Sequence, residues 1–338
     1  MRVWTLPKPE GIDSLVPVEK PTPRPGPGQV LVRMRAASLN YRDLMVVTGS
    51  YARGTPLPDL VPLSDGAGEV TEIGPGVTRV KPGDRVAGIF MQTWLGGDIE
   101  PDHAGSSLGG AIHGVLAEYV VFSQDGLVRL PEHLSFEEGA TLPCAAVTAW
   151  NALYGGRPLR VGESVLVLGT GGVSVFALQL AHAAGARVIA TSSSDGKLAQ
   201  ARTLGASDGV NYRDHPEWHE EVLRLTDGRG VDHVLEIGGA STLPRSIGSA
   251  RVGGQVHQIG VRAGAGGEID PSGAMRKGLI LRGIYVGSRQ MFEAMNRAIA
   301  LHKIVPVIDG VFGFEQAKDA YRHLESQAHV GKVVIRVE

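Results

Sequence analysis

The sequence has 338 residues but only one cysteine, Cys144. A single cysteine excludes an internal disulfide and any metal site built from several cysteines. No apolar run reaches the ~18 residues that a membrane-spanning helix requires, and the first residues lack the pattern of a signal peptide. We therefore expect a cytoplasmic protein with no membrane partner.

An excess of charge of one sign is also missing. The chain has 33 Lys and Arg against 35 Asp and Glu, for a formal net charge of −2, and the two signs are mixed along its length. A nucleic-acid-binding protein usually carries a basic patch or stripe, so we expect no nucleic-acid partner. Glycine, by contrast, is abundant. Its 47 residues are about twice the usual ~7% and predict many tight turns.

Length and composition predict two domains with sizeable cores, since 338 residues exceed one typical domain and 43% of them are hydrophobic. The first 30 residues are rich in proline, which disfavours helix. Short alternating segments such as Gln29–Ala37 and Leu116–Phe122 then follow, with many turns between them. Residues 91–112 are polar and glycine-rich and are expected to form a surface loop. The first part of the chain therefore reads as a compact, mostly β domain.

From about residue 134 the pattern changes to alternating strands and helices. Ser135 and Glu138 have the spacing of a capping box at a helix start. We expect strands at Val165–Leu168, Arg187–Thr191, Gly209–Tyr212, Asp232–Ile237, Gln255–Gly260 and Leu279–Val286. Helices are expected to begin near Gly172, Asp195, Glu217, Thr242 and Gln290. This alternation predicts a doubly wound parallel sheet. A last strand, Lys332–Val337, is expected to return to the first domain.

One stretch carries the clearest chemical signal. Gly169, Gly171, Gly172, Val173 and Ser174 lie between the first strand of this second part and a nearly all-apolar helix. In a strand, glycine turn and helix, the backbone can approach a pyrophosphate, and the helix N-terminus supplies free N–H groups. Ser174 stands where the usual fingerprint has its third glycine. The alternative interpretation is a glycine-rich turn with no ligand.

Taken together, several segments resemble the medium-chain dehydrogenase/reductase superfamily over essentially the whole chain. The matching segments are Ala37–Asp43, Ser64–Val70, Val80–Val86, Ala117–Tyr119, Ala140–Trp150 and Gly169–Val173. The resemblance implies an α/β fold in which a Rossmann domain, with a doubly wound parallel sheet, is joined to a GroES-like, mostly β domain. It implies residues 1–145 and 289–338 for the GroES-like substrate domain, and 146–288 for the dinucleotide-binding domain.

The departures from that family concern zinc. Zinc alcohol dehydrogenases place a Cys where this chain has Asn40, Gly-His-Glu where it has Leu63–Asp65, and a second Cys at the position of Cys144. Catalytic zinc needs about three protein ligands, and Cys144 is the one residue here with the expected chemistry. The four-cysteine lobe for structural zinc is also replaced by the cysteine-free segment 91–110. We therefore expect no metal.

Without zinc the chain resembles the quinone oxidoreductase and enoyl reductase branch. That branch shows Asn-Tyr-x-Asp, then Gly-x-Tyr, then a Leu-Pro segment that ends in Thr-Ala-Trp. These patterns are matched by Asn40–Asp43, Gly49–Tyr51 and Leu142–Trp150. The resemblance implies that Asn40 and Thr148 lie near the nicotinamide.

The end of the second Rossmann strand indicates which nicotinamide is bound. NAD-preferring domains carry Asp or Glu there, which holds the ribose 2′-hydroxyl and repels a 2′-phosphate. Here Ser192 and Ser193 follow the strand and can donate hydrogen bonds to phosphate. In the NADP reductases that the chain resembles, a Lys at this offset and a Tyr after the third strand contact the 2′-phosphate. Lys197 and Tyr212 match them, so we expect NADP(H).

Asp195 disagrees with that reading, because it is an acid near the same strand end. We interpret it as the N-cap of the next helix, with ribose binding as the alternative. The resemblance further implies that the ends of the fifth and sixth strands contact the carboxamide of the nicotinamide. The residues there are Gly260, Val261, Val286 and Ser288.

The resemblance implies hydride transfer to an activated C=C bond or quinone, with a quinone, enone or enoyl compound as the small-molecule substrate. Tyr41 and Arg42 lie where the zinc enzymes of the family keep catalytic residues, and Tyr51 is close to them in sequence. One of these phenols could donate to the developing oxyanion. Alternatively, Tyr41 only packs, and Arg42 forms a structural ion pair with Asp43. Two other functions stay open: a zinc-free NADP alcohol dehydrogenase acting on a carbonyl, and a non-catalytic NADPH-binding protein. The resemblance also implies a homodimer that pairs two sheets through segment Leu279–Tyr285. The apolar character of this segment fits that contact, or a merely buried edge.

Overall fold

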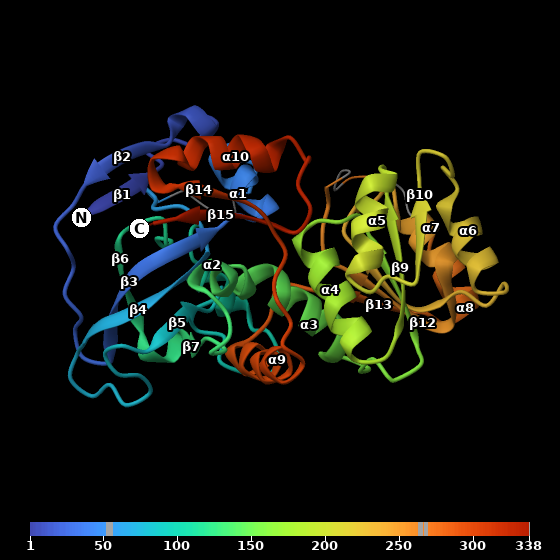
Figure 1. The fold of residues 1–338 in the computed structure, drawn as a ribbon, viewed down its shortest axis with the longest axis horizontal. Helices are drawn as coiled ribbons and strands as arrows, with labels where there is room; N and C mark the ends of the chain where they lie inside the picture. The colour runs from blue at the N-terminus through green and yellow to red at the C-terminus, as the bar shows by residue number, and fades with distance from the viewer. Residues whose placement is uncertain (52–56, 263–265, 267–269, 338) are drawn as a thin grey trace. The chain divides into compact units, whose positions relative to one another are not determined.

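The computed structural model describes residues 1–51, 57–262, 266 and 270–337 (Figure 1). Contacts between Cα atoms divide the chain into two compact units. The first, which we call the β unit, comprises Met1–Val147 and Gly287–Glu338, and the second, the α/β unit, comprises Thr148–Val286. These limits lie within two residues of the domain limits expected from the sequence.

The β unit is built on a seven-stranded sheet in the order β14-β15-β3-β4-β5-β7, with β6 also paired to β3. Its strands are β3 (Gln29–Ser38), β4 (Asp65–Ile73), β5 (Arg85–Gly88), β6 (Tyr119–Ser123), β7 (Leu127–Arg129), β14 (Ile308–Gly313) and β15 (Lys332–Arg336). A separate pair is formed by β1 (Arg2–Thr5) and β2 (Val16–Glu19). Figure 1 shows the C-terminal β15 beside β3, to which it pairs antiparallel. The expected return of the last strand is confirmed.

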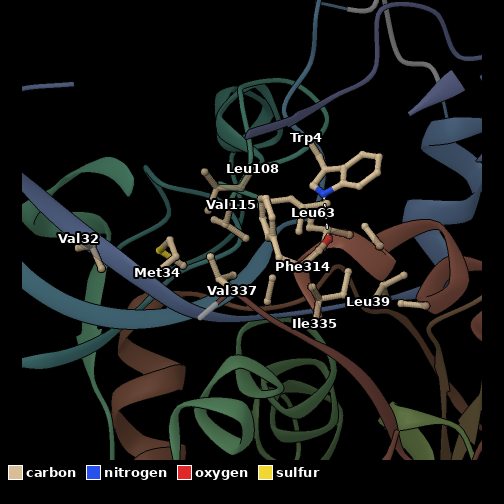
Figure 2. Packing of buried hydrophobic residues seen from close by; sticks show 14 of the residues in the cluster. Trp4, Val32, Met34, Leu39, Leu63, Leu108, Val115, Phe314, Ile335 and Val337 are labelled. Atoms are coloured by element: carbon tan, nitrogen blue, oxygen red, sulfur yellow. Dashed lines mark hydrogen bonds between the residues drawn. The ribbon is translucent and has the colours of Figure 1, made fainter. Parts of the chain in front are cut away.

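The core of this unit lies under the long strand β3. Val30, Val32 and Met34 alternate along it and face one hydrophobic cluster, as the two-residue period of a strand requires. Trp4 closes the cluster from the N-terminal segment, and its indole Nε1 donates to the carbonyl oxygen of Phe314 at 3.0 Å (Figure 2). The two ends of the chain are therefore fixed in one core.

Short helices surround that sheet. They are α1 (Tyr41–Val47), α2 (Phe136–Ala140), α9 (Arg289–His302) and α10 (Ala317–Glu325), with 3₁₀ turns at Ile12–Ser14, Pro101–Ser106, Gln124–Gly126 and Phe314–Gln316. A π-helical turn, Leu142–Ala146, leads into α3 (Val147–Tyr154), where the α/β unit begins. The expected capping box at α2 is confirmed, because Glu138 N–H donates to Ser135 Oγ at 3.1 Å and Ser135 N–H donates to Glu138 Oε2 at 2.6 Å.

The α/β unit contains a six-stranded sheet in the order β10-β9-β8-β11-β12-β13, and every neighbouring pair is parallel. Its strands are β8 (Ser164–Leu168), β9 (Arg187–Ser192), β10 (Asp208–Asn211), β11 (Val231–Glu236), β12 (Ala250–Gln258) and β13 (Ile280–Gly283). Its later helices are α4 (Gly172–Ala183), α5 (Asp195–Thr203), α6 (Trp218–Leu225), α7 (Leu243–Ser249) and α8 (Ser272–Lys277). This is the strand order of a Rossmann domain, as the sequence predicts.

Four details differ from the sequence predictions. The sixth strand is four residues long rather than spanning Leu279–Val286, and neither β14 nor α8 was expected. The expected surface loop at 91–112 is borne out only in part: residues 97–102 are exposed, whereas Met91, Trp94 and Leu108 are buried. Among the described residues, no helix is both long and apolar enough to cross a membrane.

Candidate functional site

The glycine turn is shaped by local hydrogen bonds. Gly169 has a φ of +70°, which only glycine adopts without strain, and its N–H donates to Thr191 Oγ1 at 3.3 Å. Gly171 is the N-cap of α4. Ser174 Oγ donates to the carbonyl oxygen of Leu168 at 2.6 Å. The serine in the third glycine position therefore satisfies its hydroxyl within the turn and still packs against the strand.

The space over this turn suits a phosphate group. A Cβ atom added to Gly171 would come within 4 Å of one neighbouring atom, Arg262 Nη1 at 3.9 Å, and one added to Gly169 would meet only Ile237 Cδ1, at 3.8 Å. Gly172 and Val173 form the first turn of the twelve-residue helix α4, where N–H groups lack partners inside the helix. Free N–H groups at an uncrowded helix N-terminus fit a pyrophosphate.

The end of β9 presents hydroxyl groups. Ser192 is buried, and its Oγ accepts the N–H of Ser194 at 3.3 Å. Ser194, and not Asp195 as the sequence suggested, is the N-cap of α5, and its Oγ accepts the N–H of Lys197 at 3.5 Å. The N-cap prediction was wrong because three successive serines offered equivalent caps. The Asp195 carboxylate instead accepts Asn211 Nδ2 at 2.9 Å, so part of its hydrogen-bonding capacity is already used within the protein.

The neighbouring strand end brings Tyr212 to the same place. Its N–H donates to the carbonyl oxygen of Ser192 at 3.0 Å, and 42% of the residue is exposed. Ser193 directly follows Ser192 in the chain and is half-buried. The structure thus gathers Ser192, Ser193, Lys197 and Tyr212 at the adjoining ends of β9 and β10.

The residues after β12 and β13 have distinct environments. A Cβ on Gly260 would lie 2.5 Å from the Ile237 carbonyl oxygen, so this close approach requires glycine. Val261 is 43% exposed, whereas Val286 is buried with a φ of +55°. Ser288 belongs to the β unit, where its Oγ caps α9 by accepting the N–H of Met291 at 3.3 Å.

In the β unit, the residues at the zinc-ligand positions form a buried polar cluster around Asp65. Ser64 Oγ donates to Asp65 Oδ1 at 2.7 Å, and Cys144 N–H donates to Oδ2 at 3.1 Å. The Nζ of Lys332, on β15, donates to Asn40 Oδ1 at 2.6 Å and lies 3.9 Å from Asp65 Oδ2. Sequence reasoning missed Lys332, because nothing local to it indicates a partner some 270 positions away.

This donor set does not fit catalytic zinc. Catalytic zinc needs about three N, S or O protein ligands, and of Asn40, Ser64 and Cys144 only the cysteine is a good zinc ligand. The carboxylate of Asp65 already accepts hydrogen bonds from Ser64 and Cys144 and has the Lys332 ammonium beside it. Within the described ranges, no group of three His, Cys, Asp or Glu side chains is placed to hold a metal ion.

Helix α1 carries two of the three catalytic candidates, Tyr41 and Arg42. Asn40 is its N-cap, and the Asn40 N–H donates to Asp43 Oδ2 at 2.8 Å. Tyr41 follows on the surface and is 39% exposed. Burial raises the pKa of Asp43 to about 6, although the Arg42 guanidinium, 3.6 Å away, opposes that rise. The side chain of Tyr41 is therefore accessible to a substrate. The buried ion pair of Arg42 and Asp43 beside it is arranged as a structural contact.

Arg42 is held by packing as well as by charge. Its guanidinium carbon lies 4.6 Å from the Tyr51 ring centroid and 4.9 Å from that of Phe90, and Nη1 donates to the Leu108 carbonyl oxygen at 2.7 Å. These contacts connect α1 to Leu108, a buried residue of segment 91–112. They favour a structural role for Arg42, and they place Tyr51 against it.

A pocket of about 500 Å³ also opens in the β unit. Val3, Lys20, Val61, His113 and Phe122 are among its mainly apolar lining residues. Neither the catalytic candidates nor the cofactor candidates named above contribute to the lining. The pocket is therefore separate from the candidate site.

Comparison with known proteins identifies the same two kinds of domain. A family model described as the alcohol dehydrogenase GroES-like domain matches residues 26–132, and one described as a zinc-binding dehydrogenase matches residues 172–300. A zinc-type alcohol dehydrogenase-like protein of Schizosaccharomyces pombe is 46% identical over 340 residues, covering 97% of this chain and 96% of its own length. Acryloyl-coenzyme A reductase of Metallosphaera sedula is 30% identical, with 93% of each chain covered.

Solved structures give the same result. A Sinorhizobium meliloti protein described as a candidate alcohol dehydrogenase superposes with a TM-score of 0.92 at 40% identity, covering 99% of this chain and 98% of its own. A structure described as an NAD-dependent alcohol dehydrogenase superposes with a TM-score of 0.91 at 36% identity, with both chains fully covered. With its GroES-like and Rossmann units and relatives that span nearly its whole length, the chain belongs to the medium-chain dehydrogenase/reductase superfamily of oxidoreductases.

Proposed function

We propose that the protein is a zinc-independent, NADPH-dependent oxidoreductase that transfers hydride to an activated C=C bond or a quinone. The observation that carries the proposal is the cluster around Asp65. Asn40 and Ser64 stand at ligand positions where they are poor zinc donors, and the Lys332 ammonium lies against the one carboxylate. A reaction that needs no Lewis acid at the substrate oxygen therefore suits this site better than alcohol oxidation on zinc.

NADPH is preferred over NADH in this proposal because of the end of β9. Ser192 stands where a carboxylate would hold the ribose 2′-hydroxyl, and Lys197 adds a positive charge in the first turn of α5. The relative described as NAD-dependent points the other way. Affinities for the two cofactors, measured side by side, decide between them.

The chain's own residues supply binding and orientation. Bound NADPH would provide the hydride, and the protein would provide geometry and electrostatics. Gly171, Gly172 and Val173 are placed to receive the pyrophosphate with backbone N–H groups. Thr148 is buried on α3 and is assigned to the nicotinamide side, as is Asn40 in the β unit.

The oxyanion that develops on an enone or enoyl thioester needs a hydrogen-bond donor. Tyr41 is the leading candidate, because its side chain is exposed at the N-terminus of α1. Tyr51 is the second, since its ring packs on the Arg42 guanidinium, which holds it close to α1. The relative named acryloyl-coenzyme A reductase supports an enoyl compound as acceptor.

The second candidate function is a zinc-free alcohol dehydrogenase acting on a carbonyl, and the relatives described as alcohol dehydrogenases favour it. The same tyrosines would then donate to the carbonyl oxygen. The third candidate function is that of a non-catalytic NADPH-binding protein. Such a protein would need the same intact glycine turn as the two enzymes, so only a measurement of turnover distinguishes it from them.

The test follows NADPH oxidation with quinones, enones, enoyl thioesters and saturated ketones, using protein dialysed against a chelator and checked for metal content. We expect turnover with an activated alkene or quinone, a saturated carbonyl product, and no dependence on added zinc. An alcohol product would support the second candidate. Tight NADPH binding without turnover on any acceptor would support the third. Full kcat in both Tyr41→Phe and Tyr51→Phe would exclude the tyrosines as donors.

We also propose a homodimer formed through β13. This strand is the edge of the parallel sheet, and its Ile280 and Leu281 are 47% and 43% exposed. Pairing two such edges would extend the sheet and cover both side chains. Light scattering should give twice the mass of the chain, and Leu281→Arg should give the monomer mass. An unchanged mass in Leu281→Arg would place the contact elsewhere.

A further inference from the structure

Val286 has an unusual backbone conformation. Its φ of +55° lies in the left-handed region, which β-branched residues avoid because their Cβ substituents clash with the backbone. The residue is 5% exposed, so it is not a mobile surface turn. Such a conformation persists only where the surrounding structure enforces it, and strained residues of this kind gather at binding sites.

The conformation is enforced from helix α3. Asn151 Nδ2 donates to the Val286 carbonyl oxygen at 2.7 Å, and Asn151 is 3% exposed. Asn151 lies three residues after Thr148, so the two polar side chains share one face of an otherwise apolar helix. Sequence reasoning assigned Thr148 and passed over Asn151.

Arg282, on β13, fixes the orientation of the Asn151 amide. Its Nη1 donates to the Asn151 carbonyl oxygen at 2.8 Å, and its Nη2 donates to Asn151 Oδ1 at 2.7 Å. Since a guanidinium can only donate, it selects the amide oxygen and leaves Nδ2 to face Val286. The chain of donors from Arg282 through Asn151 to Val286 therefore has one direction.

The fold also reserves the space for this network. A Cβ on Gly155 would lie 2.1 Å from Asn151 Oδ1 and 2.8 Å from Arg282 Nη2. The next glycine, Gly156, would place a Cβ 3.4 Å from Arg282 Cδ. A side chain at Gly155 would displace the Asn151 amide and the Arg282 guanidinium together, so this hydrogen-bond network requires glycine at position 155.

We infer that Asn151 and Arg282 are positioning residues for the nicotinamide end of the cofactor: they hold the Val286 backbone in the conformation that receives the carboxamide. The inference rests on the proposed function, which assigns Val286 to the nicotinamide. It adds two residues that would act on the cofactor through the Val286 backbone. The competing explanation is that the network only stabilises the α/β unit.

The experiment compares two ligands. NADPH carries the nicotinamide, whereas 2′,5′-ADP carries only the adenosine and the 2′-phosphate. In Asn151→Asp, Arg282 keeps its acceptor but the donor to Val286 is lost. We expect NADPH affinity to fall about tenfold, the effect of one hydrogen bond, while 2′,5′-ADP affinity stays unchanged. Arg282→Met and Gly155→Ala should show the same division.

Asn296 provides a matched control. It is a buried asparagine on α9 in the β unit, and its Nδ2 donates to the Arg129 carbonyl oxygen at 2.9 Å. Asn296→Asp removes an equivalent bond and should lower the melting temperature without changing affinity for either ligand. Equal losses for NADPH and 2′,5′-ADP in the Asn151 variant, or no loss for either, would overturn the inference. If the wild-type protein binds no nicotinamide cofactor at all, the proposed function fails first and the inference with it.

Discussion

Replacing Lys332 by Met tests the electrostatics of the cluster around Asp65. The lysine is 3% exposed, and its Nζ donates to the Leu39 carbonyl oxygen and to Asn40 Oδ1 while facing the Asp65 carboxylate at 3.9 Å. Methionine fills a similar volume but carries neither charge nor donors. The variant therefore removes the positive charge and leaves a fully buried carboxylate with its two remaining hydrogen bonds.

The expected cost is large. Removing one partner of a buried ion pair costs about 3–5 kcal/mol of unfolding free energy. For a unit of this size about 2–4 °C is lost per kcal/mol, so the melting temperature of the β unit should fall by about 6–20 °C. Burial already raises the pKa of Asp65, and Lys332 opposes the rise. Without the lysine the folded state takes up a proton more readily, so the destabilisation should be greatest at neutral pH and shrink as the pH falls.

A double-mutant cycle identifies the partner. Calorimetry on Lys332→Met, Asp65→Asn and the double variant should give a coupling of at least about 1.5 kcal/mol, with the double variant more stable than Lys332→Met. Lys277→Met is the control. That ammonium donates to the carbonyl oxygens of Ile247, Gly248 and Ala250, with no carboxylate among these three partners. Its cost should not shrink at low pH. Additive effects of Lys332 and Asp65 would refute the ion-pair reasoning.

Three further perturbations have distinct readouts. Gly74→Ala places a Cβ 1.8 Å from the Gly26 carbonyl oxygen and should lower the melting temperature markedly, whereas Gly283→Ala meets no atom within 4 Å and should be tolerated. Burial lowers the pKa of His257 to about 3, so the folded state resists a proton that the unfolded chain accepts below about 6.5. The free energy of unfolding should therefore decrease as the pH is lowered from about 6.5 to about 3, by up to about 1.4 kcal/mol per pH unit. His257→Gln should reduce the loss of melting temperature over this acidic range. Ser192→Asp should raise the KM for NADPH at least about tenfold by repelling the 2′-phosphate, with less effect on NADH, and an unchanged ratio would remove Ser192 from the cofactor site.

The sequence predicted those parts of the fold that depend on local patterns. The strand β8 is a short apolar run followed by turn residues, and burial on both faces of a parallel sheet produces that pattern. Ser135 and Glu138 predict the start of α2, because both partners of a capping box lie within four consecutive residues. The return of Lys332–Arg336 to the β unit followed from its position after the sixth strand and from the family resemblance.

The remaining features depend on contacts between distant segments. The packing of the Arg42 guanidinium on the Phe90 ring joins residues 48 positions apart. Asn151 looks like an ordinary helical residue until β13 brings Arg282 to it. In both cases the partners are more than 40 positions apart or lie on different elements, so no local window contains the information. The residues of the candidate site that the sequence missed are those held by tertiary contacts.

In the proposed zinc-independent site, the poor zinc donors Asn40 and Ser64 and the buried Lys332 ammonium are linked by the cost of burying charge. Asp65 stands where zinc dehydrogenases have glutamate, and a buried carboxylate with no counter-charge would destabilise the fold. Lys332 supplies that counter-charge. It follows that restoring ligands alone, with Asn40→Cys and Ser64→His, should not create a zinc site, because Zn²⁺ would be placed beside an ammonium group. Adding Lys332→Met to those changes should raise zinc content after dialysis. Equal zinc binding with and without Lys332 would show that the ammonium does not exclude the metal.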